Sequence, residues 1–229
     1  MQKKNLIVFD IDGTLTDTVK SYTANFVQSI HQLGISKFDS DFGNYKHHTD
    51  SYISKMIYEK ETGKSFDASA IQEFENHLYN NMLSEETCSE ILGAKQIVEY
   101  LEKETDYGVC YATGSMRKTA KLKLDQIGID YHDYQLVASN EILEREKIVS
   151  TAIEHAEIFY NIDKFDNIIS IGDGIWDLKT AKNLNLHFIG IGEKNCDTLM
   201  NNGAKVVLTN FTFFDLELIS MSLFSAFNN

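Results

Sequence analysis

Two aspartates separated by one residue directly follow the first apolar segment of the chain, in the string Phe9-Asp10-Ile11-Asp12-Gly13-Thr14. Alternate residues of a strand point to the same side, so Asp10 and Asp12 can share one site. One carboxylate can attack an electrophile while the other, kept protonated by its like-charged neighbour, acts as a general acid. A bare Asp-x-Asp is more often a solvated turn. The longer string, in which Gly13 lets the backbone turn sharply, favours the catalytic interpretation.

A second acidic pair follows another apolar segment, in the string Ile171-Gly172-Asp173-Gly174-Ile175-Trp176-Asp177. If a helix begins here, Asp173 and Asp177 lie on one face, because residues four apart are neighbours on a helix. Several carboxylates converging with Asp10 would repel one another without a cation, and an oxygen-rich cluster suits Mg²⁺. The alternative for Asp177 is an ordinary acid in the first turn of a helix, where the helix dipole favours it.

Two further elements carry groups that can hold an anion. Thr113 and Gly114 follow an apolar segment and precede an expected helix, so a hydroxyl and an amide would face a phosphate there. The same tripeptide with Ser115 is also typical of a plain helix cap. Arg145 and Lys147 stand near the start of another expected helix and supply candidate cations, although both could instead be solvated surface residues.

The elements that must position these residues are predicted by periodicity. Short apolar, β-branched segments are typical of buried strands, and they occur at 5–10, 109–113, 136–138, 167–172, 187–192 and 205–209. Between the later segments, apolar residues recur at helical spacing, as in Ile148, Ala152 and Ala156. Alternating strands and helices predict an α/β fold with a Rossmann-like parallel sheet flanked by helices.

The first crossover departs from this alternation, because the next expected strand begins only at Val109. The residues in between show helical patterns at 22–33, 52–59 and 71–82. We therefore predict an all-helical domain, residues 16–87, inserted into an α/β core formed by residues 1–15 and 88–229.

These motifs, in this order, resemble the haloacid dehalogenase superfamily. The closest resemblance is to its phosphatase branch with an inserted helical cap, which includes phosphoglycolate phosphatase-like and β-phosphoglucomutase-like proteins. The resemblance implies that Asp10 is the nucleophile and Asp12 the general acid and base. It further implies that Asp10, the Asp12 carbonyl and Asp173 bind Mg²⁺ with help from Asp177. Thr113 and Gly114 would hold the phosphoryl group, and we also place Thr14 among the substrate-binding residues.

One element departs from the pattern of the superfamily, whose third motif commonly has a lysine before a proline. This chain has no proline and offers Arg145 and Lys147 instead. Arg145 is slightly favoured, and both stay candidates. In related caps, the loop corresponding to His48, Thr49 and Asp50 faces the active site and reads the substrate. The alternative is that Thr49 or Asp50 simply caps a helix and the histidine lies on the surface.

The function that follows is hydrolysis of a small phosphomonoester metabolite. A phosphomutase acting on a sugar phosphate and a catalytically silent binding protein on the same scaffold are the alternatives. A dehalogenase is disfavoured because that branch works without Mg²⁺. Phosphonate cleavage is disfavoured because Asp12 is intact and no cap lysine is evident.

Composition limits the partners and the location. The 229 residues carry a formal charge of −13, which repels nucleic acid and anionic lipid. Three widely spaced cysteines, Cys88, Cys110 and Cys196, indicate neither a disulfide framework nor a zinc site. The apolar run after Lys4 is too short for a signal peptide, and no stretch is long enough to span a membrane. We expect a cytoplasmic monomer or weak homodimer.

Overall fold

The computed structural model describes residues 2–84, 88–140, 142–216 and 219. Six parallel strands form one sheet in the order β3-β2-β1-β4-β5-β6. They are β1 (Asn5–Phe9), β2 (Tyr107–Ala112), β3 (Leu136–Val137), β4 (Asn167–Gly172), β5 (His187–Ile191) and β6 (Val207–Leu208). The expected fold class is confirmed. Because β1 lies between β2 and β4, the ends of these three strands meet at one edge of the sheet.

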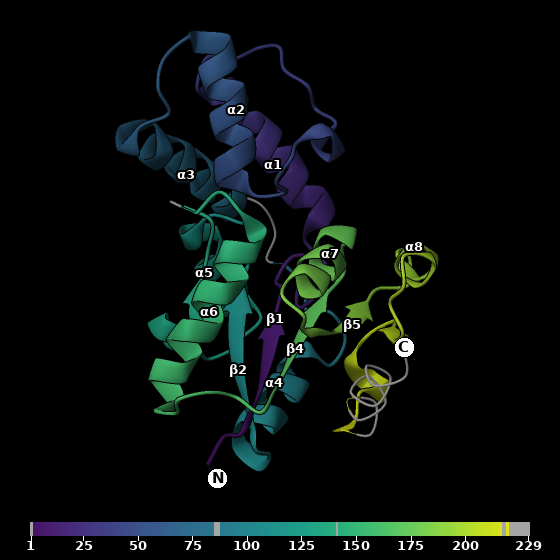
Figure 1. Ribbon diagram of the computed structural model, residues 1–229. Coiled ribbons are helices and arrows are strands. Elements are labelled where there is room, and N and C mark those ends of the chain that lie inside the picture. The colour runs from purple at the N-terminus through teal and green to yellow at the C-terminus, as the bar shows by residue number, and fades with distance from the viewer. Residues whose placement is uncertain (1, 85–87, 141, 217–218, 220–229) are drawn as a thin grey trace.

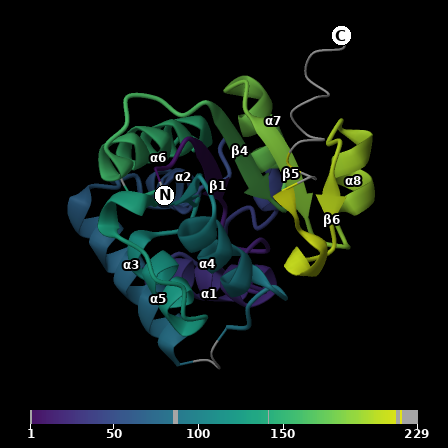
Figure 2. The ribbon, with the colours of Figure 1, turned by 90° about the horizontal axis from the view of Figure 1, so that it is seen from below.

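Helices cover both faces of this sheet. They are α4 (Ala94–Glu104), α5 (Arg117–Gln126), α6 (Arg145–Tyr160), α7 (Ile175–Asn183) and α8 (Cys196–Asn201). Residues of β1 alternate between two cores: Ile7 packs with residues of α4 and α5, whereas Leu6 packs with residues of α6. Helices α4 and α6 accordingly lie on opposite sides of the strands (Figure 2). This double burial explains why Leu6 to Phe9 of β1 are all apolar.

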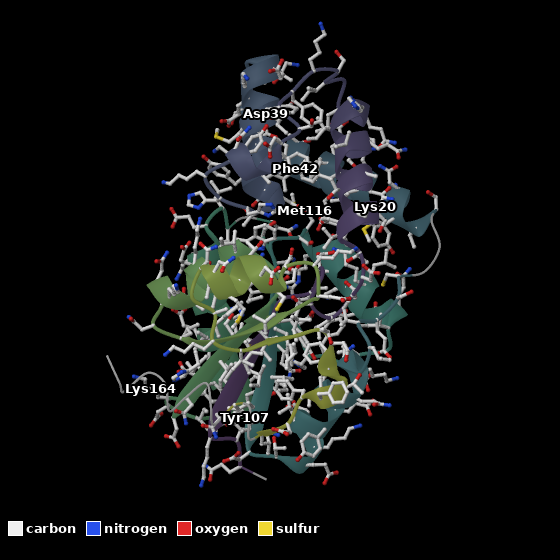
Figure 3. The ribbon with its side chains drawn as sticks, turned by 90° about the vertical axis from the view of Figure 1, so that its right-hand side faces the viewer. Lys20, Asp39, Phe42, Tyr107, Met116 and Lys164 are labelled. Atoms are coloured by element: carbon white, nitrogen blue, oxygen red, sulfur yellow. The ribbon has the colours of Figure 1, made fainter. Side chains whose placement is uncertain are left out.

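Three helices form a separate layer over the carboxyl ends of the strands (Figure 1). They are α1 (Val19–Gln32), α2 (Asp50–Thr62) and α3 (Ala68–Leu83), with a short 3₁₀ turn, η1 (Phe42–Asn44), between the first two. Their apolar faces share one hydrophobic cluster, to which Met116 of the sheet-bearing part also belongs. Met116 lies at the junction with this layer, and Phe42 lies within it (Figure 3).

The chain leaves and re-enters the α/β part at neighbouring points. Thr16 forms an antiparallel bridge with Glu90, and the Ile91 N–H donates to the Leu15 carbonyl at 2.8 Å. The proposed domain division at residues 16 and 87 stays a prediction, and Thr87 itself lies outside the described residues. No helix in the described part of the chain combines the length and hydrophobicity needed to cross a bilayer.

Candidate active site

The end of β1 places Asp10 at the centre of the site. The Asp10 N–H donates to the Ile171 carbonyl at 2.9 Å, so the ladder with β4 continues to this residue. The chain then turns at Gly13, which has a φ of 77°. A Cβ atom at Gly13 would lie only 2.2 Å from Oδ2 of Asp173. Only glycine therefore permits both this backbone conformation and the close approach of the second acidic motif.

Three buried carboxylates meet beside this turn. Oxygen atoms of Asp10, Asp173 and Asp177 all lie within 4.8 Å of one another. Burial, followed by repulsion from Asp177, Asp10 and Asp12, raises the pKa of Asp173 to about 9. Burial also raises the pKa of Asp10 to about 7. The Arg145 charge opposes this rise, but burial together with repulsion from Asp177 and Asp12 outweighs it. Such a cluster is unfavourable when fully ionised, unless positive charge is supplied.

The cluster fits a divalent cation. Oδ1 of Asp173 is buried and has no hydrogen-bond partner among the described residues. An unsatisfied buried carboxylate oxygen is costly, and oxygen atoms are the ligands that Mg²⁺ prefers. Asp10, Asp173 and Asp177 are therefore the residues that would hold the ion. The Asp12 carboxylate does not join this cluster, because it is bound to Thr18, Ser115 and Lys123. A role of the Asp12 carbonyl in binding the ion stays a prediction.

Of the two candidate cations, the structure brings Arg145 to the acids and leaves Lys147 outside. Nη2 of Arg145 lies 2.5 Å from Oδ1 of Asp10 and 2.6 Å from Oδ1 of Asp177. Arg145 is the first residue of α6 and is buried. The Lys147 side chain is 58% exposed, and its Nζ lies 3.9 Å from Glu154. Arg145 is thus the group that can balance charge next to Asp10.

The turn after β2 lies beside the same acids. Thr113 is buried, and its Oγ1 accepts the Ser115 N–H at 3.1 Å, as a cap-like turn would. A Cβ atom at Gly114 would lie 2.7 Å from both Nη1 of Arg145 and the His48 carbonyl, so this position has room for glycine alone. Thr14 is fully buried, with Oγ1 at 3.5 Å from Oδ2 of Asp10, and it is not among the residues that line the cavity. Its predicted contact with substrate stays a prediction.

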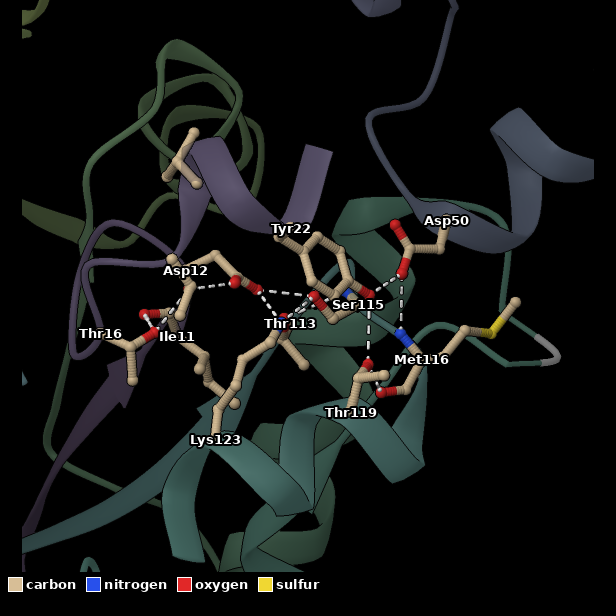
Figure 4. A network of polar contacts seen from close by, with 12 residues as sticks. Ile11, Asp12, Thr16, Tyr22, Asp50, Thr113, Ser115, Met116, Thr119 and Lys123 are labelled. Atoms are coloured by element: carbon tan, nitrogen blue, oxygen red, sulfur yellow. Dashed lines mark hydrogen bonds and ion pairs between the residues drawn. The ribbon is translucent and has the colours of Figure 1, made fainter. Parts of the chain in front are cut away.

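Asp12 is held by three donors (Figure 4). Nζ of Lys123 and Oγ of Ser115 each lie 2.6 Å from Oδ2, and Oγ1 of Thr18 donates to Oδ1 at 2.5 Å. Burial by itself would raise the pKa of Asp12, but the Lys123 charge and these hydrogen bonds outweigh it and lower the pKa. The expectation that a like-charged neighbour keeps Asp12 protonated is therefore wrong. In this arrangement Asp12 is a carboxylate at neutral pH.

The cap loop, which comprises His48, Thr49 and Asp50, contacts the site mainly through His48. Its ring stacks on Trp176, with centroids 3.8 Å apart and an interplanar angle of 6°. Burial, followed by the Arg145 charge, lowers the pKa of His48 to about 4, so the imidazole is uncharged at neutral pH. Thr49 caps α2 by accepting the Tyr52 N–H, and its hydroxyl donates to the Leu143 carbonyl at 2.8 Å.

Asp50, the third residue of the predicted specificity loop, is committed to internal contacts. Its carboxylate accepts a hydrogen bond from the Tyr22 hydroxyl and another from the Met116 N–H at 2.9 Å. Burial raises the pKa of Asp50 to about 7. These bonds join two helices of the cap to the start of α5, so Asp50 holds the cap on the core.

A cavity of about 110 Å³ lies between the cap and the strand ends. Asp10, Asp12, Thr113 and Arg145 line it from the core, while His48, Thr49 and Asp50 line it from the cap loop. The cavity thus brings together predicted site residues from strand ends and cap. Asp10 and the Arg145 guanidinium line this space, and Asp10 connects it with the acid cluster, whose other members Asp173 and Asp177 are not among the lining residues.

A comparison with protein families agrees with this geometry. The family model described as haloacid dehalogenase-like hydrolase matches residues 7–191, which include Asp10, Thr113, Arg145 and both acids of the second motif. The chain belongs to this family. It is therefore an enzyme of the haloacid dehalogenase-like hydrolases, as the order of its motifs indicates.

Several proteins resemble this hydrolase at low identity. Phosphonoacetaldehyde hydrolase from Latilactobacillus sakei is 23% identical over 206 residues, covering 82% of this chain and 76% of the relative. A family IA hydrolase of the superfamily from Entamoeba histolytica matches with a TM-score of 0.71 and 16% identity, and the match covers 96% of this chain and 99% of that protein. CbbY from Rhodobacter sphaeroides, in complex with phosphate, matches with a TM-score of 0.67 and 15% identity, and the match covers 91% of this chain and 95% of CbbY. These structural matches concern the fold.

Sequence reasoning missed Lys123, which decides the state of Asp12. A signal for it is present in the sequence. Met116, Ala120 and Leu124 mark the buried side of α5, and Lys123 falls on this side at helical spacing from Met116 and Ala120. A lysine on a buried stripe requires a partner with negative charge, because an unpaired buried ammonium is strongly unfavourable.

Proposed function

We propose that this hydrolase is a Mg²⁺-dependent phosphatase that cleaves a small phosphomonoester through a phospho-aspartyl intermediate on Asp10. The observation that carries the proposal is the acid cluster. A guanidinium bridges Asp10 and Asp177 next to the unpartnered oxygen of Asp173. These groups lie together at the carboxyl ends of the strands, where open α/β sheets bind ligands. CbbY, which shares the fold, was crystallised with phosphate.

In the first step, a carboxylate oxygen of Asp10 attacks phosphorus while the bond to the leaving oxygen breaks. Arg145 lies within hydrogen-bond distance of Asp10 and can donate to the negatively charged phosphoryl oxygens. A bound Mg²⁺ would supply further positive charge there and would lower the pKa of the surrounding carboxyl groups. Thr113 and Gly114 border the same space and can position the phosphoryl group.

In the second step, water attacks the phosphorus of the aspartyl phosphate and releases Asp10 and inorganic phosphate. Asp12 is a carboxylate at neutral pH, which suits it to take the proton from this water. Protonation of the leaving oxygen in the first step requires Asp12 to gain a proton beforehand. A phosphomonoester, with a second pKa near 6, can bring that proton as its monoanion.

Release of inorganic phosphate from a panel of small phosphomonoesters, such as ethyl phosphate and glycerol 3-phosphate, tests this proposal. We expect turnover with Mg²⁺, loss of turnover with EDTA, and a fall of roughly 10³-fold or more in kcat for Asp10→Asn, because removing a nucleophile costs at least this much. Asp17→Asn is the matched control, since Asp17 is an exposed acid of the same segment. Equal turnover by Asp10→Asn and Asp17→Asn would refute the mechanism.

The similarity to phosphonoacetaldehyde hydrolase raises cleavage of a carbon–phosphorus bond as an alternative. We disfavour it because such a reaction needs an amine that can reach the substrate, and no lysine is among the described residues that line the cavity. Lys123 is fully buried and paired with Asp12. Phosphomonoester hydrolysis needs no such amine.

A further inference from the structure

The side of the cavity formed by the cap is largely apolar. Val19 and Phe26 of α1, Phe42 of η1 and Ile53 of α2 line it, together with the Trp176 ring from the core. Phe42 packs edge-on against Phe26, with ring centroids 5.1 Å apart. A leaving group attached to a phosphate at Asp10 would extend among these side chains, because the core side is occupied by the acids and Arg145.

The three hydroxyl groups on this side, of Tyr22, Thr23 and Thr49, already have partners within the protein. The Tyr22 hydroxyl lies 3.1 Å from Thr119 Oγ1 and donates to Asp50. The Thr49 hydroxyl donates to a core carbonyl, and the Thr23 hydroxyl donates to the Val19 carbonyl at 2.8 Å. A substrate hydroxyl group next to these three side chains would lose its hydrogen bonds to water without gaining equivalent ones, which is unfavourable.

The charges around the cavity disfavour a leaving group that carries a negative charge. Arg145 is the one lysine or arginine among the described lining residues, and its guanidinium already binds Asp10 and Asp177. A substrate with a second phosphate or a carboxylate would find no cation for that group. It would also approach Asp50, a buried acid on the cap side.

We propose that the cavity accepts a phosphomonoester whose leaving group is short, uncharged and largely apolar. This rests on the proposed phosphatase function and specifies its substrate class. The cavity of about 110 Å³ is smaller than the roughly 150 Å³ apolar cavity that admits benzene in an engineered protein. Because the phosphoryl group takes part of this volume, the leaving group that fits beside it has fewer than the six non-hydrogen atoms of benzene.

Matched pairs of substrates test the proposal on the unmodified enzyme with Mg²⁺. Propyl phosphate and glycerol 3-phosphate share a three-carbon chain but differ by two hydroxyl groups, and ethyl phosphate and 2-phosphoglycolate differ by a carboxylate. We expect kcat/KM for propyl phosphate to exceed that for glycerol 3-phosphate by about 100-fold, the discrimination an apolar pocket makes against one added hydroxyl. Ethyl phosphate should exceed 2-phosphoglycolate by at least as much.

A variant that introduces a cation tests the charge argument directly. In Phe42→Arg, a guanidinium replaces a half-buried ring on the cap side of the cavity. We expect the ratio of kcat/KM for 2-phosphoglycolate over ethyl phosphate to rise at least about tenfold. Gln28→Arg is the matched control, because Gln28 is exposed on α1 and does not line the cavity. It should leave the ratio unchanged.

The outcomes separate this proposal from the function on which it rests. Turnover of all four esters with glycerol 3-phosphate or 2-phosphoglycolate as the better member of its pair would overturn the substrate class and leave the phosphatase intact. Preference for xylulose 1,5-bisphosphate, the sugar bisphosphate seen in a CbbY complex, would do the same. Absence of turnover of all four esters in the presence of Mg²⁺ would refute the phosphatase and with it the substrate class.

Discussion

Replacing Lys123 with methionine tests the electrostatic support of Asp12. The change keeps an unbranched side chain of similar length and removes the charge. Lys123 is fully buried; its Nζ lies 2.6 Å from Asp12, 3.0 Å from Ser115 and 3.5 Å from the centroid of the Tyr22 ring. The variant therefore removes an ion pair and a cation–π contact while it preserves most of the packing of α5.

The expected loss of stability follows from the burial of the Lys123–Asp12 ion pair. Two unit charges 2.6 Å apart attract by about 6 kcal/mol at an effective dielectric constant of 20, before desolvation is counted. Breaking a buried pair by removing one partner costs about 3–5 kcal/mol in free energy of unfolding. Asp12 keeps the hydrogen bonds from Ser115 and Thr18, so we expect a loss near the lower end, about 3 kcal/mol.

Lys121→Met is the matched control on the same helix. Lys121 also lies 2.6 Å from an acid, Asp133, but both side chains are exposed, so its loss should cost less than about 1 kcal/mol. The free energies come from urea unfolding followed by circular dichroism. A double-mutant cycle with Asp12→Asn should give a coupling energy of at least about 1.5 kcal/mol. Equal stability of Lys123→Met and Lys121→Met, or zero coupling, would refute the reasoning.

Other changes around the site have definite expected outcomes. Mg²⁺ at 100 times its Kd should raise the free energy of unfolding by about 2.7 kcal/mol, and Asp173→Asn should abolish this gain in a thermal-shift assay with EDTA as reference. Without Mg²⁺, the pKa of about 9 at Asp173 means that the folded state keeps a proton that the unfolded state releases near pH 4. Stability measured by urea unfolding should then fall between pH 5 and 8, by about 1.4 kcal/mol per pH unit from Asp173 alone, and the raised pKa values of Asp10 and Asp50 add to this fall. A rise would contradict these shifts. Gly114→Ala should lower kcat/KM about tenfold or more, because its Cβ would meet Arg145 and the His48 carbonyl at 2.7 Å; unchanged kinetics would show that this close packing is dispensable. Trp176→Ala should raise KM by about two- to tenfold through loss of the ring stack with His48, whereas an unchanged KM would remove that contact from substrate binding.

The fold could be predicted because its elements are locally encoded. Leu6 to Phe9 of β1 form a run of buried apolar residues, as expected of a strand covered on both faces, and β2, β4 and β5 carry similar largely apolar runs. The boundaries were less predictable, since β3 and β6 have only two residues each. Their short pairing with β2 and β5 depends on how the loops pack, which periodicity does not report.

The choice between Arg145 and Lys147 could have been made from helical periodicity. Ile148, Ala152 and Ala156 are buried on α6, and this stripe extends backward to Arg145 at a spacing of three residues. Lys147 lies two positions from Arg145, about 200° around the helix, so both cannot face the site. The packing of the helix against the sheet therefore decides which cation reaches Asp10.

The protonation state of Asp12 could not be read from its own motif. The other acid of its motif, Asp10, would by itself raise the pKa of Asp12, whereas the partners of Asp12 in space come from three other segments. Thr18 belongs to the connection into the cap, Ser115 to the turn after β2, and Lys123 to α5. Such convergence depends on tertiary packing, and a motif of adjacent residues carries no information about it.

The same contacts tie Asp12 to the cap. The Tyr22 ring, on the first cap helix, covers the Lys123 ammonium, and its hydroxyl donates to Asp50 at the start of the second. Because the ring excludes water from one side of the Lys123–Asp12 pair, the attraction within the pair is stronger than it would be in solvent. The cap thus takes part in setting the charge of the residue that we assign as general base, in addition to forming the apolar side of the cavity.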